Sequence, residues 1–240
     1  MPNWCENELF IIGSKESLLR FEDQILHWEN PETKGNKGEV VFDFNKVIPI
    51  PQELNSTDES FMLKAAYKIL FEGCGEQYPK VPMLLPDLQR FIDAYSMDIA
   101  VRFNAFVFQE AMSTGKTIGE LSFEYEKGAL LIRSNSEKYG HSNWYDWCVD
   151  NWGTKWSAAD AYVAQKLRNE DKTKFVLNVD FKTPWSPPIP IVDKLALDFP
   201  DTEFCLKYFE CGMAFKGIHR VLNSSIIKSM SASYSGSRGG

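Results

Sequence analysis

The segment Tyr139–Trp156, YGHSNWYDWCVDNWGTKW, is central to the interpretation of this chain, because it holds four of the seven tryptophans. Tryptophan combines a large apolar surface with a single N–H donor, so a cluster of this kind either packs into a core or forms a binding surface. From Trp144 the spacing i, i+3, i+4, i+7 is helical, with Ser142 placed to cap the helix and Gly153 placed to end it. The segment therefore predicts a short helix followed by a turn.

The candidate partner-binding residues are the aromatic and cationic side chains of this segment, together with one later tryptophan. They are His141, Trp144, Trp147, Trp152, Lys155, Trp156 and Trp185. In a functional role, such rings stack on bases or form the hot spot of a protein interface. In a structural role, they pack where an inserted segment rejoins the sheet. For Lys155, the alternatives are a phosphate contact or cationic stacking, and a stem that lies over an aromatic ring.

The composition is that of a folded soluble protein. Of the 240 residues, 44% are hydrophobic and 25% are charged, and the apolar runs are far shorter than the ~20 residues of a membrane helix. The N-terminus has no basic region followed by an apolar stretch, so we expect no signal peptide and a cytoplasmic location. Five cysteines without a CxxC pair and three scattered histidines show no metal-binding spacing. We expect no metal and no cofactor.

The net charge of −7 is distributed unevenly along the chain. No acidic residue follows Glu210, whereas Lys216, Arg220, Lys228 and Arg238 do. The last 30 residues therefore carry +4, which leaves −11 on the first 210. An acidic body disfavours nucleic acid and suits either a basic protein surface or simple solubility. Only the basic C-terminal part is expected to offer a salt-sensitive contact with nucleic acid.

Hydrophobic periodicity predicts an α+β fold. Expected strands cover residues 8–12, 39–50, 175–181, 204–209 and 213–218, and expected helices cover 14–28 and 190–199, with more helices within 55–140. Without the helical segment, the order is strand, helix, strand, then strand, helix, strand, with one extra strand. This order is the ferredoxin-like split βαβ arrangement, an antiparallel sheet with helices on one face.

Three parts of the chain follow from this interpretation. We expect a ferredoxin-like core formed by residues 1–54 and 141–222, a mostly helical insertion at 55–140, and a mobile Ser/Gly-rich tail at 223–240. Ferredoxin-like sheets also bind RNA through exposed aromatic residues. The candidates for that role are Phe175, Phe181, Phe204, Tyr208 and Phe215, although basic residues are sparse among them.

Two patterns that suggest catalysis or nucleotide binding are incomplete. His141 near Asp146 has the composition of a general base oriented by a carboxylate, but no nucleophile stands beside it in a recognisable context. Ser113–Thr117 ends like a phosphate-binding loop, but Glu110 occupies the position where that pattern requires glycine. We therefore expect a protein without enzymatic activity.

Several segments also occur in the same order in a known family: MPNWCENELFIIG at the N-terminus, VIPIP at 47–51, WYDWCVDNWGTKW at 144–156, FKTPWSPP at 181–188 and FPDTEFCLKYFECGMAFKG at 199–217. On these segments the chain resembles the YubB-like phage and plasmid proteins. The resemblance implies a ferredoxin-like C-terminal domain and a gene carried on mobile elements. It provides no catalytic residues to transfer.

These observations lead to one principal hypothesis and two alternatives. The principal one is a non-enzymatic phage- or plasmid-encoded protein that engages a host protein in the bacterial cytoplasm, with inhibition of host defence as its role. The first alternative is a ferredoxin-like module that binds single-stranded nucleic acid or a nucleotide. The second is an enzyme that uses His141. No membrane partner is expected.

Overall fold

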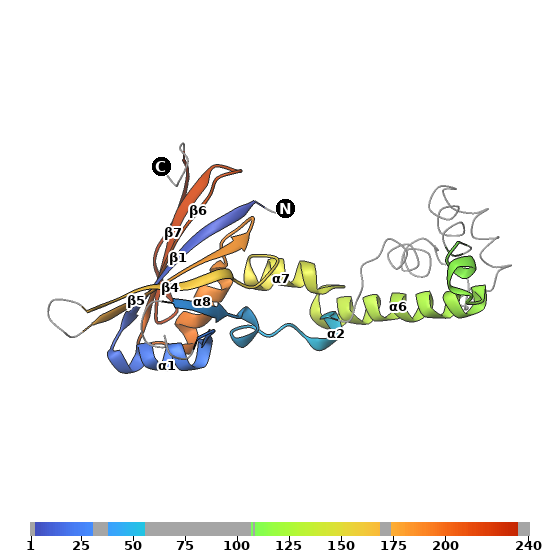
Figure 1. Ribbon diagram of the computed structural model, residues 1–240, viewed down its shortest axis with the longest axis horizontal. Coiled ribbons are helices and arrows are strands. Elements are labelled where there is room, and N and C mark those ends of the chain that lie inside the picture. The colour runs from blue at the N-terminus through green and yellow to red at the C-terminus, as the bar shows by residue number, and fades with distance from the viewer. Residues whose placement is uncertain (1–2, 31–37, 56–106, 108, 169–173, 235–240) are drawn as a thin grey trace. The chain divides into compact units, whose positions relative to one another are not determined.

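The computed structural model describes residues 3–30, 38–55, 107, 109–168 and 174–234 (Figure 1). Its strands are β1 (Trp4–Gly13), β2 (Leu26–Trp28), β3 (Gly38–Phe42), β4 (Ala159–Arg168), β5 (Phe175–Pro184), β6 (Glu203–Glu210), β7 (Phe215–Leu222) and β8 (Ser225–Ser233). Its helices are α1 (Lys15–Ile25), α2 (Gln52–Asn55), α6 (Ile118–Tyr139), α7 (Trp144–Trp152) and α8 (Ile189–Asp198). They fall into two compact units. Met1–Ile50 with Tyr145–Gly240 form the ferredoxin-like unit, and Pro51–Trp144 form the inserted unit.

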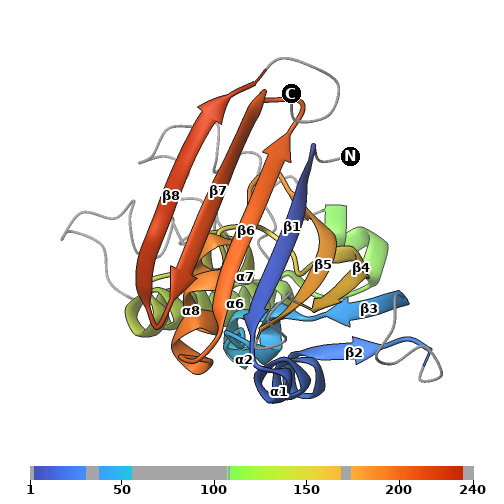
Figure 2. The same ribbon diagram turned by 90° about the vertical axis from the view of Figure 1, so that its left-hand side faces the viewer.

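The described strands form one antiparallel sheet in the order β2-β3-β4-β5-β1-β6-β7-β8 (Figure 2). The βαββαβ succession of the split βαβ arrangement is formed, in chain order, by β1, α1, β4, β5, α8 and β6. Strands β2 and β3 extend the sheet beyond β4, and the hairpin of β7 and β8 extends it beyond β6. The predicted α+β class with a ferredoxin-like antiparallel sheet is confirmed.

Helices α1 and α8 cover one face of the sheet. Helix α1 contacts β1 and β5, and α8 contacts β6 and β7, behind which it lies in Figure 2. The side chains that point to this covered face form the core, among them Leu9, Ile11, Leu177, Val179, Phe204 and Leu206. Helix α1 begins at the expected cap, because the Ser14 side chain accepts a hydrogen bond from the Ser17 N–H at 3.1 Å. We call the opposite face the open face.

The second strand of the ferredoxin-like core is β4, and the expectation that residues 39–50 would fill this place is wrong. The sequence of β4, ADAYVAQKLR, is rich in residues that favour helices, so its strand pattern is weak. Pairing with β5 imposes the strand nevertheless, from the Ala159–Lys182 pair to the Arg168–Phe175 pair. Residues 39–50 instead supply the outer strand β3 and a 3-10 turn at Phe44–Lys46. The first expected helix is also shorter, because Leu26–Trp28 pairs with β3.

The expected mobile tail at 223–240 is wrong for Ser225–Ser233, which form strand β8. The strand was not predicted because its sequence is rich in serine and none of its side chains is buried. Strand β8 is held by its hydrogen-bonded pairing with β7. The two strands are joined by Asn223 and Ser224, whose φ values of 48° and 59° are typical of a two-residue type I′ hairpin turn. Strands β7 and β8 therefore contain three of the cations of the last 30 residues, namely Lys216, Arg220 and Lys228.

The inserted unit contains a long helix, α6, that starts where the incomplete phosphate-loop pattern ends. Thr117 caps it by accepting a hydrogen bond from the Glu120 N–H, and the Glu120 carboxylate accepts one from the Thr117 N–H. Lys116 pairs with Glu124 at 2.8 Å. The Ser113–Thr117 segment therefore leads into the N-terminus of α6, which Thr117 caps. The helices expected between residues 56 and 106 lie outside the described residues. No helix in the described part of the chain is both long and apolar enough to cross a membrane.

The glycine that ends α7 generates a test of the fold. Gly153 has a φ of +78°, and a Cβ there would lie 2.8 Å from Pro190 Cδ and 3.0 Å from the Pro187 carbonyl oxygen. We predict that Gly153→Ala lowers the free energy of unfolding by about 2 kcal/mol, measured by chemical denaturation. The control Gly119→Ala, whose nearest neighbour is Thr117 Oγ1 at 4.0 Å, lies in the first turn of α6. Alanine favours a helix over glycine, so this change should leave the free energy of unfolding unchanged or raise it by up to about 1 kcal/mol. Equal stability of the two variants would contradict this account of the turn.

Candidate binding surface

Two of the predicted site tryptophans, Trp147 and Trp152, belong to the core. They are 7% and 2% exposed, and their rings meet edge to face at 6.2 Å between centroids. The ring of Trp152 also contacts that of Phe44 at 5.7 Å, and its Nε1–H donates to the Ile48 carbonyl at 2.8 Å. With the indole donor satisfied and the ring enclosed, Trp152 ties α7 to the segment that follows β3. Neither ring is available to a partner in this conformation.

Trp156 and Trp185 are instead at the surface, each 41% exposed, and Lys155 connects them. Its ammonium lies 4.4 Å from the ring centroid of Trp156, 5.5 Å from that of Trp185 and 5.0 Å from that of Tyr145. A cation over three rings is favourable because each ring face is electron-rich. Of the alternatives stated for Lys155, the structure shows its ammonium over aromatic rings of this chain. We call Tyr145, Lys155, Trp156 and Trp185 the Lys155 surface.

The backbone under this surface is held by hydrogen bonds between two turns. The Thr154 hydroxyl donates to the Pro184 carbonyl at 2.9 Å, and the Ser186 hydroxyl donates to the Gly153 carbonyl at 2.5 Å. The Trp185 N–H donates to the Asn3 carbonyl at 2.8 Å. Trp185 has a φ of +64°, a left-handed conformation that is costly for a bulky residue. A strained backbone that keeps a large ring at the surface is a feature that clusters at functional sites.

The remaining predicted site residues, His141 and Trp144, lie in the inserted unit. Both are half-buried. The structure therefore divides the predicted set into a buried pair, a surface group around Lys155, and two residues of the other unit. The role of His141 in partner binding stays a prediction, and the alternative of an enzyme that uses His141 stays a hypothesis. Within the described residues, no group of three or more histidine, cysteine or acidic side chains is arranged to hold a metal.

Two buried cysteine thiols of the ferredoxin-like unit, those of Cys5 and Cys148, are poorly suited to nucleophilic chemistry. Burial raises the pKa of Cys148 to about 12, and burial together with the charges of Glu210 and Glu6 raises the pKa of Cys5 to about 12. At neutral pH both groups are protonated thiols, whereas the thiolate is the nucleophile. These two cysteines therefore pack as small apolar side chains.

A polar trio that the sequence analysis missed joins α8 to the outer hairpin. The His219 ring is 2% exposed, and its Nε2 lies 2.7 Å from Asp193 Oδ1 while its Nδ1 lies 3.1 Å from Ser229 Oγ. Hydrolases use the same three residue types, but they place them in a cleft that admits substrate. None of the three lines the groove that lies over β6–β8. We assign the trio a structural role, and no sequence motif connects its distant members.

The open face carries a different set of side chains from the one expected. The five aromatic residues proposed for nucleic-acid contact have the alternation of the covered face, and Phe181 and Phe204 are 2% and 0% exposed within the core. The open-face aromatics of β1, β5 and β6 are Trp4, Phe10 and Phe209. The error arises because both faces of β6 contain aromatic residues, so composition does not reveal which face the helices cover.

The division of the tryptophans generates a stability test. Trp152→Ala should lower the free energy of unfolding by about 3–5 kcal/mol, because it leaves a cavity beside Phe44. Trp156→Ala should lower it by less than about 1 kcal/mol, because that residue is 41% exposed and lies outside the core. Denaturant titration followed by far-UV circular dichroism measures both. A larger loss for Trp156→Ala than for Trp152→Ala would contradict the assignment of core and surface.

Comparison with known proteins supports the fold of the C-terminal part. Residues 151–237 match a family described as the ferredoxin-like domain in Api92-like protein. Among solved structures, protein api92 from Yersinia pseudotuberculosis is similar at 14% sequence identity and a TM-score of 0.41, with 99% of each chain covered. No curated protein sequence matches the chain. The segment that contains β4 to β8 is thus similar to the ferredoxin-like domain of Api92-like proteins.

Proposed function

We propose that the protein is a non-enzymatic binding protein and that its Lys155 surface docks on a partner protein. The observation that carries the proposal is the exposure of Trp156 and Trp185 on either side of a lysine that stacks on both rings. Tryptophan and tyrosine are enriched among the few residues that dominate interface energies. A soluble protein has little other reason to keep two indole rings at the surface in one place.

Preorganisation of these rings strengthens the proposal. Ordering a mobile side chain on binding costs about 0.5–1.5 kcal/mol, and rings already fixed by a neighbour avoid most of that cost. Lys155 restrains the two rings, and the hydrogen bonds of Thr154 and Ser186 restrain the turns that carry them. We therefore expect the rings to lose little conformational freedom when a partner binds.

Charge suggests the chemistry of the partner. The first 210 residues carry −11, and Asp146 and Asp150 are exposed on α7, next in sequence to the Lys155 surface. Such an acidic surround attracts a basic protein and accelerates the encounter. Arginine side chains suit this surface, since a guanidinium can stack on an indole and also pair with a carboxylate. We therefore propose a partner with a basic, arginine-bearing surface.

The cellular setting of the proposal comes from the resemblance to YubB-like proteins. That resemblance favours a phage- or plasmid-encoded protein that acts in the cytoplasm of a bacterial host, so the partner is a host protein. Interference with host defence is the role that we propose for such an interaction, because proteins of mobile elements meet host defences on entry.

The proposal is tested by capture from a bacterial lysate, followed by titration with the purified captured protein. We predict a 1:1 complex whose affinity falls as salt increases. The variant Trp156→Ala/Trp185→Gly should bind at least about tenfold more weakly, since hot-spot truncations cost more than about 1.4 kcal/mol. Glycine is used at position 185 because it tolerates the φ of +64°.

A matched control removes two exposed aromatic residues elsewhere. Phe123 and Tyr162 are 60% and 39% exposed, and Phe123→Ala/Tyr162→Ala should bind the partner as the wild type does. Both variants must show the wild-type circular dichroism spectrum. Equal binding by the Lys155-surface variant and the wild type, equal loss in the control, or recovery of no stoichiometric partner would each overturn the proposal.

A further inference from the structure

The open face of β6, β7 and β8 gathers cations that are far apart in the sequence. Cross-strand register aligns three rows on it: Cys205, Arg220 and Lys228; Lys207, Ile218 and Met230; Phe209, Lys216 and Ala232. Alternate residues of a strand point to opposite faces, so these rows lie opposite the buried Leu206 and Val221. Each row contains at least one cation.

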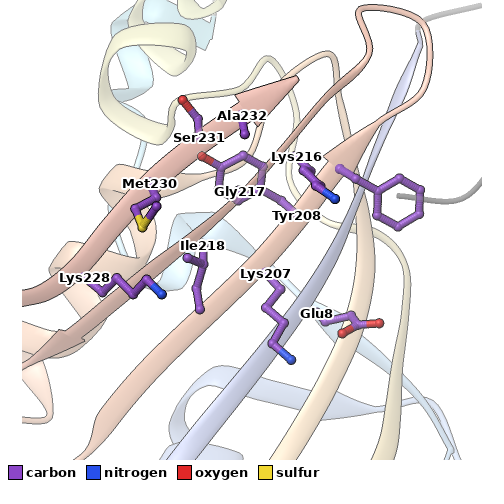
Figure 3. A pocket seen from close by; sticks show the side chains of 11 residues that line it. Glu8, Lys207, Tyr208, Lys216, Gly217, Ile218, Lys228, Met230, Ser231 and Ala232 are labelled. Atoms are coloured by element: carbon purple, nitrogen blue, oxygen red, sulfur yellow. The ribbon is translucent and has the colours of Figure 1, made fainter. Parts of the chain in front are cut away.

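A groove of about 460 Å³ lies over these rows (Figure 3). Three different strands each contribute a lysine to its lining, namely Lys207, Lys216 and Lys228. Figure 3 shows the side chain of Ile218 between those of Lys207 and Lys228. Ile218 forms an apolar floor with Phe209 and Met230, the last of which is 59% exposed. The groove thus combines an apolar floor with a border of three lysines and one carboxylate, that of Glu8 opposite Lys207.

The charge of the open face changes sign across the sheet. Over β6–β8 its cations are Lys207, Lys216, Arg220 and Lys228. Glu203 pairs with one of them, Arg220. Over β1 and β5 the face carries Glu6, Glu8 and Asp180 together with Lys182, which pairs with Asp160. Burial, with the nearby charges of Glu8 and Glu6, raises the pKa of Asp180. An anion is therefore attracted to β6–β8 and repelled from the centre of the sheet.

One cross-strand pair on this face brings two positive charges together. Arg220 and Lys228 stand directly opposite each other on β7 and β8, and like charges in such positions destabilise a sheet. Glu203 offsets part of this repulsion through its ion pair with Arg220, and a bound anion beside Lys228 would offset the rest. The Lys207 side chain is also kept on this face by a cation–π contact, with its ammonium 4.8 Å from the ring centroid of Phe10.

We propose that this groove binds single-stranded nucleic acid through its phosphates, with bases lying against the apolar floor. Lys216 and Arg220 are four residues apart on one strand, about 13 Å, and three strands span about 10 Å. A cationic field of this size suits several nucleotides better than one phosphate. An acidic peptide would match the lysines but leave Phe209, Ile218 and Met230 uncovered, whereas bases stack on such a floor. The inference goes beyond the proposed function, since it uses different residues.

The test is fluorescence anisotropy with a labelled 12-nucleotide oligodeoxythymidine and the matching oligouridine at several salt concentrations. The variant Lys207→Gln/Lys216→Gln/Lys228→Gln should bind at least about tenfold more weakly than the wild type at low salt. Three lost phosphate contacts should also reduce the slope of log K against log salt by about 2. The control Lys15→Gln/Lys46→Gln/Lys174→Gln makes the same change in net charge outside β6–β8, and it should keep the wild-type affinity and slope.

Each other outcome would overturn the inference. No binding of either strand by the wild type at low salt would remove it, and an equal loss in both triple variants would show only a general charge effect. A poly-glutamate peptide that displaces the strand at equal charge concentration would assign the groove to acidic protein. Tighter binding of a duplex than of the single strand would contradict the role of the apolar floor. Thermal unfolding of all variants checks that the surface substitutions leave the fold intact.

Discussion

The antiparallel pairing of β1 with both β5 and β6 is the constraint on which the rest of the ferredoxin-like unit depends. β1 pairs with β5 along all ten of its residues. Within it, the buried Asn7 side chain donates to Thr183 Oγ1 at 2.8 Å and to the Cys5 carbonyl at 2.9 Å. A slip of one residue would turn Asn7 to the open face and Phe10 into the core. The buried partner groups would then be unsatisfied, which opposes the slip.

This register places the side chains that form the core on one face of the sheet and the side chains available for binding on the other. Side chains on the covered face, such as Leu9 and Leu206, are fully buried beneath α1 and α8. Their sequence neighbours point the other way and give the open face its charged side chains and its exposed apolar ones. The Lys155 surface arises differently, from two turns that place indole rings beyond the end of α7. Both candidate surfaces consist of side chains that the core does not use, and for that reason they can change without loss of the fold.

Much of the fold could be predicted because its main signals are local. The Ser14 cap, the proline-bounded start of α8 and the alternation of β5 each appear in a few neighbouring residues. Strand β4 could not be predicted, because it exists through its pairing with β5 and its own residues favour helix. Strand β8 was hidden for the same reason, since its serines resemble a linker and only the ladder with β7 holds it.

The candidate sites were predicted only in part, because exposure depends on packing. The sequence identified the tryptophans but gave no means to separate Trp152, which lies against Phe44, from Trp185, which the strained turn holds at the surface. Three of the four cations of β6–β8, namely Lys216, Arg220 and Lys228, were visible only as the positive charge of the last 30 residues, and Lys207 was not singled out. Their gathering on one face follows from cross-strand register, which requires knowledge of the strand order.

Hydroxyl-radical footprinting of the wild-type protein, resolved to single residues, tests the separation of covered and open side chains most directly. We predict fast oxidation of Trp185 and Met230, which are 41% and 59% exposed. We predict strong protection of Trp152 and Leu206, which are 2% and 0% exposed. Protection should disappear in denaturant. Oxidation of Trp152 as fast as that of Trp185, or protection of Met230 equal to that of Leu206, would contradict the account.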